Sequence, residues 1–419
     1  MEEQQQVEVE VEVPSYFVCP ISLQIMRDPV TLPTGITYDR DGIERWLLTA
    51  GTCPLTKQPV PPDCDPTPNH TLRRLIQSWC ALHADHGVDL VPTPKPPADR
   101  ARVADLVSRL RAATSSAALL DALRELRDVA AESERNRKLL AAVPGAVDVL
   151  AAVVVGSCRD AKSSGHAKAA CDEALEIVCS LELSERCLAR LVERNEELVD
   201  ALVATLQRTN TTSRAHAALL LEAVTAVMPS NRLVSLPEEV FGEAVQLLRD
   251  RVSSPATRAA LHVLVGTTSW GRNRVKAVDA GAVAVLVDML LDGPVERRGC
   301  ELALAALDRM CGCAEGRAAL VSHGAGVAVV GRKVLRVSEV ASEKAVRVLR
   351  SVARHAATAA VVQEMAQTGA VEKLCVVAQS EQCGERTRER ARETLRLHAR
   401  AWRNSPCLQP HLQALYPSC

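Results

Sequence analysis

Apolar residues recur at helical spacing along most of the chain, from about residue 103 to residue 402. Segments such as "VERRGCELALAALDRMCG", "EVASEKAVRVLRSVARH" and "SRAHAALLLEAVTAV" place apolar side chains at positions i, i+3, i+4 and i+7. This spacing gathers the apolar side chains on one side of a helix. The pattern therefore predicts a long series of amphipathic helices that bury their apolar sides against one another.

A longer period accompanies the helical one. Gly281, Gly324 and Gly369 lie 43 and 45 residues apart, and each separates a short helical segment from one rich in Val and Leu. A glycine permits the left-handed turn that ends a helix. One such unit cannot bury its own apolar face, so neighbouring units must stack into a superhelix. The alternative, an irregular helical bundle, has no reason to repeat this register.

The first 84 residues contain shorter and more mixed segments. We expect a loop to open at Cys19 and a hairpin to turn at Gly35. The segment "DRDGIERWLLTA" predicts a helix capped by an aspartate, and a second loop begins at Cys53. The segment "NHTLRRLIQSWCALH" predicts a closing helix with Asn69 as its N-cap. The expected core consists of Ile25, Met26, Ile43, Leu47, Leu72 and Ile76.

Prolines mark the boundary between these two regions. The segment "DHGVDLVPTPKPPADR" contains four of them, which remove amide donors and disfavour helix.

The fold class predicted from these three regions is mostly α, with a small α+β module before the helical repeats. The predicted parts are a flexible acidic N-terminus (1–13), the module (14–84), a Pro-rich linker (85–102), about six repeats (103–402) and a C-terminal tail (403–419).

Composition narrows the fold and function classes. Apolar residues make up 47% of the chain and aromatic residues only 2%, so a core of Leu, Val and Ala suits packed helices. The 50 basic and 51 acidic residues nearly cancel, which argues against a nucleic-acid partner. No apolar run reaches about 18 residues, so we expect no integral membrane segment. Without a secretory segment, the 15 cysteines should be mostly free thiols of a cytoplasmic protein with a nuclear pool.

Two tetrapeptides, "CPIS" from Cys19 and "CPLT" from Cys53, look like halves of a zinc motif. A tetrahedral zinc site favours C-x-x-C, but Ser22 and Thr56 stand where the second cysteines should be. The remaining Cys and His residues of the module do not form two tetrahedral sets. We therefore expect no metal, and loops that hydrogen bonds and ion pairs hold together. The candidates for this network are Ser22, Thr37, Asp39, Arg40 and Thr56.

Residues 14–84 resemble the U-box domain along their whole length. The matching motifs are "CPIS", "DPV", "TGITYDR", "IERWL", "CPLT" and "PNHTLRRLIQSW". The helical units resemble armadillo repeats, and the two together resemble the plant U-box/armadillo-repeat E3 ubiquitin-protein ligases, especially the subgroup linked to stress and immune signalling. The resemblance implies a RING-like, zinc-free U-box followed by an α-solenoid, with no cofactor. It also implies recruitment of a ubiquitin-conjugating enzyme charged with ubiquitin.

The resemblance further implies which residues contact that enzyme. Ile21, Trp46 and Pro54 fall on the family's contact positions, and we expect them to be exposed. Lys57 falls where related ligases carry a basic residue that hydrogen-bonds both ubiquitin and the enzyme, although lysine lacks the fork of arginine. The full predicted contact set is Cys19, Pro20, Ile21, Trp46, Pro54, Leu55 and Lys57. Catalysis should be positional, because no His and acid stand beside Cys19 to make it a covalent nucleophile.

Further expectations concern partners and modification. The armadillo repeats should bind protein substrates, and the U-box is a candidate surface for a homo-oligomer. Thr67 and Thr93 each precede a proline in an expected loop, so both are candidate phosphorylation sites. The alternative function is an armadillo scaffold or adaptor with an inactive U-box. Trp270 and Trp402 lie near helix ends without a period, unlike the tryptophan ladders of nuclear-import armadillo proteins, which argues against that alternative.

Overall fold

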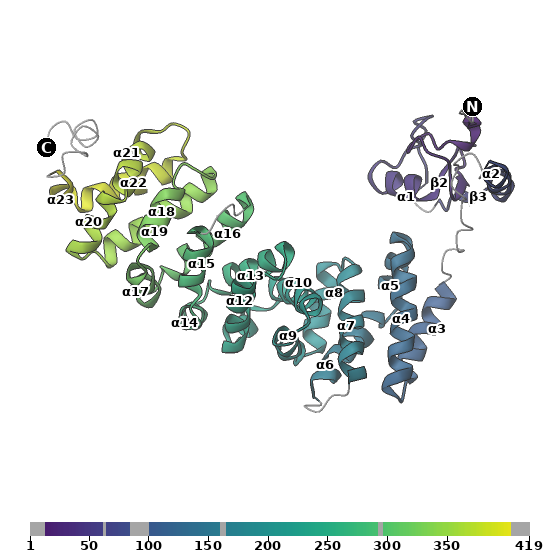
Figure 1. Cartoon of the computed structure of the whole chain (residues 1–419), viewed down its shortest axis with the longest axis horizontal. Coiled ribbons are helices and arrows are strands. Elements are labelled where there is room, and N and C mark those ends of the chain that lie inside the picture. Colours follow the sequence, from purple (N-terminus) through teal and green to yellow (C-terminus); the bar gives the residue numbers. More distant parts are fainter. Residues whose placement is uncertain (1–12, 62–63, 84–99, 160–164, 292–295, 404–419) are drawn as a thin grey trace, which may run out of the picture. The chain divides into compact units, whose positions relative to one another are not determined.

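The computed structural model describes the chain except residues 1–12, 62–63, 84–99, 160–164, 292–295 and 404–419. The chain divides into two compact units, Met1–Asp99 and Arg100–Cys419 (Figure 1). Among the described residues, the strands belong to the first unit and the second unit is helical. The predicted fold class, mostly α with a small α+β module first, is confirmed.

The first unit consists of a small sheet, two helices and the loops that join them. Its elements are η1 (Ser15–Phe17), β1 (Pro29–Thr31), β2 (Thr37–Asp39), α1 (Arg40–Thr49), β3 (Thr67–Pro68) and α2 (His70–Leu82). The strand order is β2-β1-β3, with both pairs antiparallel. Val30 of β1 lies opposite Tyr38 of β2. The hairpin turns at Gly35, whose φ of 81° is a left-handed conformation that a side chain would strain.

The two helices of the first unit begin in different ways. Asn69 caps α2 as predicted, because its side chain accepts a hydrogen bond from the backbone N–H of Leu72 at 3.0 Å. Asp39 stands at the N-cap position of α1 but makes no capping hydrogen bond. Its carboxylate accepts from the backbone N–H groups of Arg27 and Asp28 instead. The predicted aspartate cap of α1 is therefore wrong, because the loop before β1 competes for the same carboxylate.

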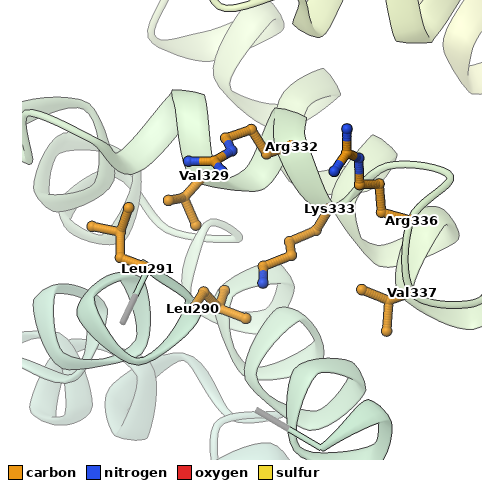
Figure 2. A pocket seen from close by; sticks show the side chains of 7 residues that line it. All are labelled: Leu290, Leu291, Val329, Arg332, Lys333, Arg336 and Val337. Atoms are coloured by element: carbon orange, nitrogen blue, oxygen red, sulfur yellow. The ribbon is translucent and has the colours of Figure 1, made fainter. Parts of the chain in front are cut away.

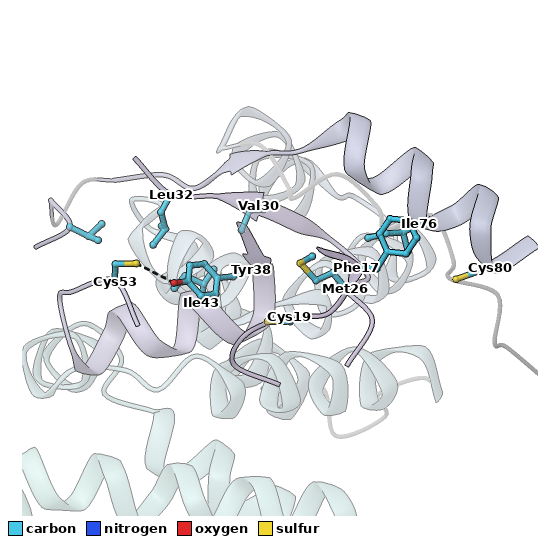
Figure 3. Close-up of a cluster of buried hydrophobic side chains, with 11 residues drawn as sticks. Phe17, Cys19, Met26, Val30, Leu32, Tyr38, Ile43, Cys53, Ile76 and Cys80 are labelled. Atoms are coloured by element: carbon cyan, nitrogen blue, oxygen red, sulfur yellow. Dashed lines mark hydrogen bonds between the residues drawn. The ribbon is translucent and has the colours of Figure 1, made fainter. Parts of the chain in front are cut away.

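One buried cluster joins the sheet to both helices (Figure 3). The predicted core residues belong to it, some fully buried and some packed at its edge: Met26, Ile43 and Ile76, then Ile25, Leu47 and Leu72. Two buried aromatic rings, Phe17 and Tyr38, were not among the predicted core residues. A small module has little apolar surface to bury, so each large ring contributes much of its stability.

The second unit is a stack of helices in chain order (Figure 1). It begins with α3 (Arg100–Ala112) and α4 (Ser116–Glu132), continues with six groups of three helices, and ends with α23 (Ala399–Arg403) in the described part of the chain. The groups are α5 (Glu134–Ala142), α6 (Ala146–Arg159) and α7 (Gly165–Ser180); α8 (Glu185–Arg194), α9 (Leu198–Leu206) and α10 (Thr211–Val227); α11 (Ser230–Val234), α12 (Glu238–Asp250) and α13 (Ser254–Thr267); α14 (Gly271–Asp279), α15 (Ala282–Leu291) and α16 (Arg297–Met310); α17 (Ala314–Ser322), α18 (Gly326–Lys333) and α19 (Glu339–His355); α20 (Ala359–Gln367), α21 (Ala370–Gln379) and α22 (Glu385–Leu397). The third helices of successive groups pack on one another, from α7 to α22. Stacking therefore buries the apolar faces as the repeat predicted.

The helical unit begins slightly before the predicted boundary at residue 103. Helix α3 starts at Arg100, inside the segment predicted to be linker. The prolines end at Pro97, and the "RAR" that opens α3 contains good helix formers. The helix therefore begins about one turn before Val103, where the apolar pattern starts.

Glycines separate the first and second helices in most groups. Gly281 and Gly369 adopt the predicted left-handed conformation, and so does Gly145 of the first group. Gly324 does not, so the prediction is wrong for that group. The crowded position there is Gly326, where an added Cβ would clash with the carbonyl oxygen of Leu320. The group still needs a glycine at this turn, but for close packing rather than for a positive φ.

Ion pairs link neighbouring groups along the stack. Arg127 of α4 meets Glu173 of α7 at 2.7 Å, and Arg350 of α19 meets Glu393 of α22 at 2.6 Å. Half-buried pairs of this kind add little net stability, because the cost of desolvating the charges offsets much of their attraction. Apolar burial therefore provides most of the stability, and the pairs favour one register between groups.

No single described helix is long and apolar enough to cross a membrane. One bent pair, Glu134–Ala142 with Ala146–Ser157, reaches the required length and composition, and its two parts diverge by 85°. Both parts belong to the packed repeats, where Leu140 and Leu150 are fully buried.

Trp402 of α23 closes the last group, because its ring is buried and its indole N–H donates to the carbonyl oxygen of Val362 at 3.0 Å. We expect Trp402→Ala to destabilise this group by about 3–5 kcal/mol, because it removes a large buried ring and leaves a cavity. Amide hydrogen exchange should accelerate in α20, α21 and α22 and stay unchanged in α5, α6 and α7, because each group contacts only its neighbours. An equal acceleration in all groups would contradict this expectation.

Candidate functional site

Two loops of the first unit have the same backbone geometry. We call residues 19–24, "CPISLQ", loop 1 and residues 53–58, "CPLTKQ", loop 2. In loop 1 the N–H of Cys19 donates to the carbonyl oxygen of Gln24 at 2.8 Å. In loop 2 the N–H of Cys53 donates to the carbonyl oxygen of Gln58, also at 2.8 Å. Each loop is therefore closed by its own backbone.

A second backbone hydrogen bond makes the likeness closer. The N–H of Leu23 donates to the carbonyl oxygen of Cys19, and the N–H of Lys57 donates to that of Cys53, both at 2.9 Å. Leu23 and Lys57 have φ values of 57° and 58°, a left-handed conformation that costs a non-glycine residue roughly 1–2 kcal/mol. This conformation was not predicted for either residue. Both loops begin with "CP" and have Gln at the sixth position, so the sequence could have indicated that they share one backbone conformation.

The retained cysteines are hydrogen-bond acceptors inside the module. The thiol sulfur of Cys19 accepts from the backbone N–H of Asp39 at 3.3 Å, and that of Cys53 accepts from the Thr34 hydroxyl at 3.4 Å. Both side chains are fully buried. The predicted contact between Cys19 and the conjugating enzyme is therefore wrong, because its side chain cannot reach a partner.

The hydroxyl of Tyr38 ties β2 to loop 2 (Figure 3). It accepts a hydrogen bond from the N–H of Leu55 at 3.2 Å, so its own proton is free to donate to the sulfur of Cys53 at 3.1 Å. Burial, together with the hydrogen bond to Cys53, raises the pKa of Tyr38 to about 12. Tyr38 was predicted neither for the network nor for the core, because its partners lie 15 and 17 residues away in the chain.

The state of Cys53 follows from the same contacts. Burial raises the pKa of this thiol, but hydrogen bonds from Thr34, Thr56 and Tyr38 outweigh burial and lower the pKa to about 6. Donors that converge on the sulfur favour its charged form. These hydroxyls therefore occupy the place around Cys53 that zinc would take in a metal-bound loop.

Carboxylates hold the segment that follows loop 1. Asp39 accepts from the backbone N–H groups of Arg27 and Asp28 at 2.9 and 2.7 Å. Asp28 in turn pairs with Arg40 at 2.6 Å and with Arg73 of α2 at 3.7 Å. The predicted roles of Asp39 and Arg40 in the network are confirmed, and Asp28 and Arg73 extend it.

The hydroxyl residues of the predicted network differ in importance. Thr37 lies within 2.9 Å of the Thr31 hydroxyl across β1 and β2, and Thr56 accepts weakly from the N–H of Gln58 at 3.4 Å. Ser22 is exposed and makes no hydrogen bond to any described residue. The prediction is therefore wrong for Ser22, because backbone hydrogen bonds alone already close loop 1.

The predicted contact residues gather where both loops meet α1. Ile21 of loop 1 packs beside Gly42, at a distance of 3.8 Å from where a Cβ on that glycine would lie. Trp46 lies one turn further along α1, and its indole N–H donates to the carbonyl oxygen of Thr52 at 2.8 Å. The ammonium of Lys57 lies 5.5 Å from the centre of the Trp46 ring, within cation–π range.

We call Ile21, Trp46, Pro54, Leu55 and Lys57 the loop–helix surface. Leu55 is 60% exposed, as expected, and Lys57 is also exposed. Ile21, Trp46 and Pro54 are half-buried, and the first and second pack against the core cluster. These three were expected to be exposed and are only partly so, because side chains that face outward also support the loops. Pro20, the remaining member of the predicted set, is exposed.

The candidate phosphorylation sites are placed differently. Thr67 was expected in a loop but lies in β3, opposite Thr31, with its side chain exposed. Thr93 lies outside the described residues. Among the residues that the structure describes, no group of three or more His, Cys, Asp or Glu side chains could hold a metal ion.

Comparison with known protein families agrees with this geometry in both units. Residues 13–85 match the U-box domain, and residues 102–416 match the plant U-box protein ARM repeat region. The chain belongs to the plant U-box armadillo-repeat E3 ubiquitin-protein ligases. The predicted recognition of this family is confirmed, and membership favours a ligase over an adaptor with an inactive U-box.

Two relatives match this ligase along nearly their whole length. E3 ubiquitin-protein ligase PUB23 of Arabidopsis thaliana is 46% identical, over 97% of this ligase and 98% of the relative. E3 ubiquitin-protein ligase PUB22 of the same plant is 43% identical, over 98% and 99%. One solved structure shares the fold with a TM-score of 0.59. It is described as "A conserved phosphorylation switch controls the interaction between cadherin and beta-catenin in vitro and in vivo". The two chains are 14% identical, and the match covers 78% of this ligase and 58% of that chain.

We expect Tyr38→Phe to destabilise the U-box by about 1–2 kcal/mol, because it leaves the N–H of Leu55 and the sulfur of Cys53 without their shared partner. Amide exchange in loop 2 should also accelerate. Tyr16→Phe is the matched control, because the Tyr16 ring is exposed and its hydroxyl makes no hydrogen bond to a described residue. Equal melting temperatures for the two variants would show that the Tyr38 hydroxyl does not hold the loop.

The U-box should fold without metal, because hydroxyls and carboxylates hold the two loops where zinc would otherwise bind. We expect the full chain to melt at the same temperature with and without a strong chelator. Elemental analysis of the purified protein should find no stoichiometric zinc. A lowered melting temperature after chelation would refute this expectation.

Proposed function

We propose that the loop–helix surface recruits a ubiquitin-conjugating enzyme charged with ubiquitin, while the armadillo repeats hold the protein substrate. One observation carries the proposal: both loops, closed by the same backbone hydrogen bonds, meet α1, loop 1 through Ile21 beside Gly42 and loop 2 through Lys57 over the Trp46 ring. The surface consists of the residues that the U-box resemblance implied, except Cys19 and Pro20.

The rigidity of this surface suits a small and transient interface. Leu55 stays exposed in a loop whose backbone is fixed at both ends and at its centre by the Tyr38 hydroxyl. A side chain that is ordered before binding loses little conformational entropy on binding. A surface of this size can therefore bind and release the conjugating enzyme rapidly.

We infer that Lys57 contacts both ubiquitin and the conjugating enzyme. Its left-handed backbone turns the side chain toward the Trp46 ring, and the ammonium keeps three donors. A lysine ammonium can hydrogen-bond carbonyl groups of ubiquitin, although it cannot bind two acceptors at once as the planar guanidinium of arginine does. These hydrogen bonds support a role for Lys57 in holding the charged enzyme in one orientation.

The chemistry that the U-box contributes is orientation. Cys19 and Cys53 are fully buried, so neither thiol can attack the thioester between ubiquitin and the conjugating enzyme. The substrate lysine must attack that thioester directly, and the ligase accelerates the step by holding both reactants close together.

The wider role of the ligase is also a proposal. The resemblance to one subgroup supports a role in plant stress or immune signalling. We also propose that the ligase is located in the cytoplasm, with a nuclear pool. Imaging of the tagged full chain would test this location. The exposed ring of Tyr16 supports a homo-oligomer through the U-box, which sedimentation would test. Thr67 is exposed just before α2, so a phosphate there would add charge close to the helix N-terminus.

Self-ubiquitination with activating and conjugating enzymes tests the proposed surface. We expect Leu55→Ala to slow it roughly tenfold or more without changing the melting temperature, because Leu55 is exposed and central to the surface. Ile21→Ala and Trp46→Ala should slow it too, but they should also destabilise the U-box, because both side chains are half-buried. Leu82→Ala is the matched control, since Leu82 is 77% exposed on α2, outside the surface. Normal activity in Leu55→Ala, or an equal loss in Leu82→Ala, would refute the surface.

The two units should divide the work. We expect residues 1–90 alone to build ubiquitin chains on themselves, because the U-box has its own core. They should fail to modify a protein that the full chain captures, because the armadillo repeats are missing. If this fragment modified the captured protein as fast as the full chain does, the armadillo repeats would not select substrates.

A further inference from the structure

A pocket of about 310 Å³ lies in the armadillo unit between α15, α18 and the segment that follows α18. Three cations line it, Arg332, Lys333 and Arg336, together with the apolar side chains of Leu290, Val329 and Val337. We call these six residues the basic pocket. Figure 2 shows the Lys333 ammonium reaching toward Leu290 and the Arg332 guanidinium beside Val329. Charged and apolar groups therefore face the same space.

The cations of the basic pocket have no carboxylate partner among the described residues. The third helices next to it differ, since Arg347 of α19 pairs with Asp308 of α16 at 2.9 Å. Glu301, whose partner Ser338 follows the pocket residue Val337 in the chain, is already engaged by other groups. It accepts from the Ser338 hydroxyl at 2.7 Å and meets Arg298 at 3.3 Å. The positive charge of the pocket is therefore left for a ligand.

The end of α18 does not by itself account for these charges. Cations near a helix C-terminus complement its dipole. Lys373 of α21 already serves that end, because its ammonium donates to the carbonyl oxygens of Gly331 and Arg332 at 3.0 and 2.8 Å. Burial lowers the pKa of Lys373, and the nearby charges of Arg336 and Arg332 lower it further. Like charges thus crowd this end of the helix beyond what the dipole requires.

The apolar part of the pocket continues to the surface. Leu290 and Val329 are buried, but Leu291 at the rim is 40% exposed. An apolar floor is a poor site for a free phosphate or a sugar, which need donors on every side. It suits an apolar side chain that stands between charged neighbours. The volume is at the lower limit of ligand pockets, and is large enough for one such side chain.

We propose that the basic pocket binds a short acidic peptide segment of a substrate protein, with an apolar side chain beside Leu291 and Val337 and flanking carboxylates on Arg332 and Arg336. Arginine binds carboxylates with paired hydrogen bonds, which fixes the orientation of the segment. The near-zero net charge of the chain, −1, does not favour a long nucleic acid, whereas a local cluster of cations suits a short acidic segment. This inference rests on the proposed role of the armadillo repeats in holding substrates.

Fluorescence anisotropy with the full chain tests the site directly. The probe is a labelled peptide with one leucine between pairs of Asp and Glu, and its controls replace the acids by Asn and Gln or the leucine by serine. We expect the double variant Arg332→Gln/Arg336→Gln to weaken binding of the acidic peptide roughly tenfold or more, and Leu291→Ser to weaken it less. Both control peptides should bind more weakly to the wild-type chain. Higher salt should also weaken binding.

The matched control is Arg258→Gln/Arg272→Gln, which removes the same charge from two exposed arginines elsewhere in the repeats that have no ion pair with a described residue. It should change affinity less than about twofold. An equal loss in both double variants would overturn the proposal, because only overall charge would matter. Competition by millimolar inorganic phosphate, or tighter binding of single-stranded DNA than of the peptide, would overturn it too.

Self-ubiquitination separates this inference from the proposed function. Arg332→Gln/Arg336→Gln should leave it unchanged, because the variant residues lie outside the U-box. A chain that ubiquitinates itself but does not bind the acidic peptide refutes only the basic pocket. A chain that binds the peptide but does not ubiquitinate itself refutes only the proposed recruitment of the conjugating enzyme.

Discussion

The hydroxyl of Tyr38 is the contact on which the U-box surface most depends. It accepts from the N–H of Leu55 and donates to the buried sulfur of Cys53, so it joins the sheet to the centre of loop 2. Without it a partly buried N–H would have no partner, and an unmet buried donor is costly. Together with the backbone hydrogen bonds that close loop 2, this inward contact positions the exposed side chain of Leu55.

A carboxylate, rather than a hydroxyl, fixes the position of loop 1 relative to the sheet. The carboxylate of Asp39 takes two backbone N–H groups just after the loop, and its own N–H donates to the sulfur of Cys19. Charged acceptors bind amides strongly and directionally. A metal-bound module would rely on zinc for this, whereas here the sheet itself supplies the groups that hold both loops. Loop position and sheet integrity are therefore coupled in this U-box.

The armadillo unit uses charge in a complementary way. Apolar burial between third helices stabilises the stack, and pairs such as Arg127 with Glu173 favour one register. Charges that satisfy one another in this way are not available to partners. The cations around Lys333 have no such partner among the described residues, and apolar side chains lie beside them. These cations are the part of the stack that we propose binds a ligand.

Much of the fold followed from pattern alone. Helical spacing and the glycine period predicted the stacked groups, and Asn69 predicted the start of α2, because these features act over a few residues. The motifs of the U-box predicted Trp46, Leu55 and Lys57 as contact residues for one partner.

The sequence by itself determined which residues could bury, cap or break a helix, since those preferences belong to each residue and its near neighbours. Only the tertiary structure decided which polar group met which. The Asp39 carboxylate binds backbone N–H groups before β1 rather than capping α1, and the Tyr38 hydroxyl bonds the Cys53 sulfur. Cys19 is buried, and Ser22 makes no hydrogen bond to a described residue. These outcomes depend on distances between segments far apart in the chain, where several donors compete for the same acceptor and packing determines which one reaches it.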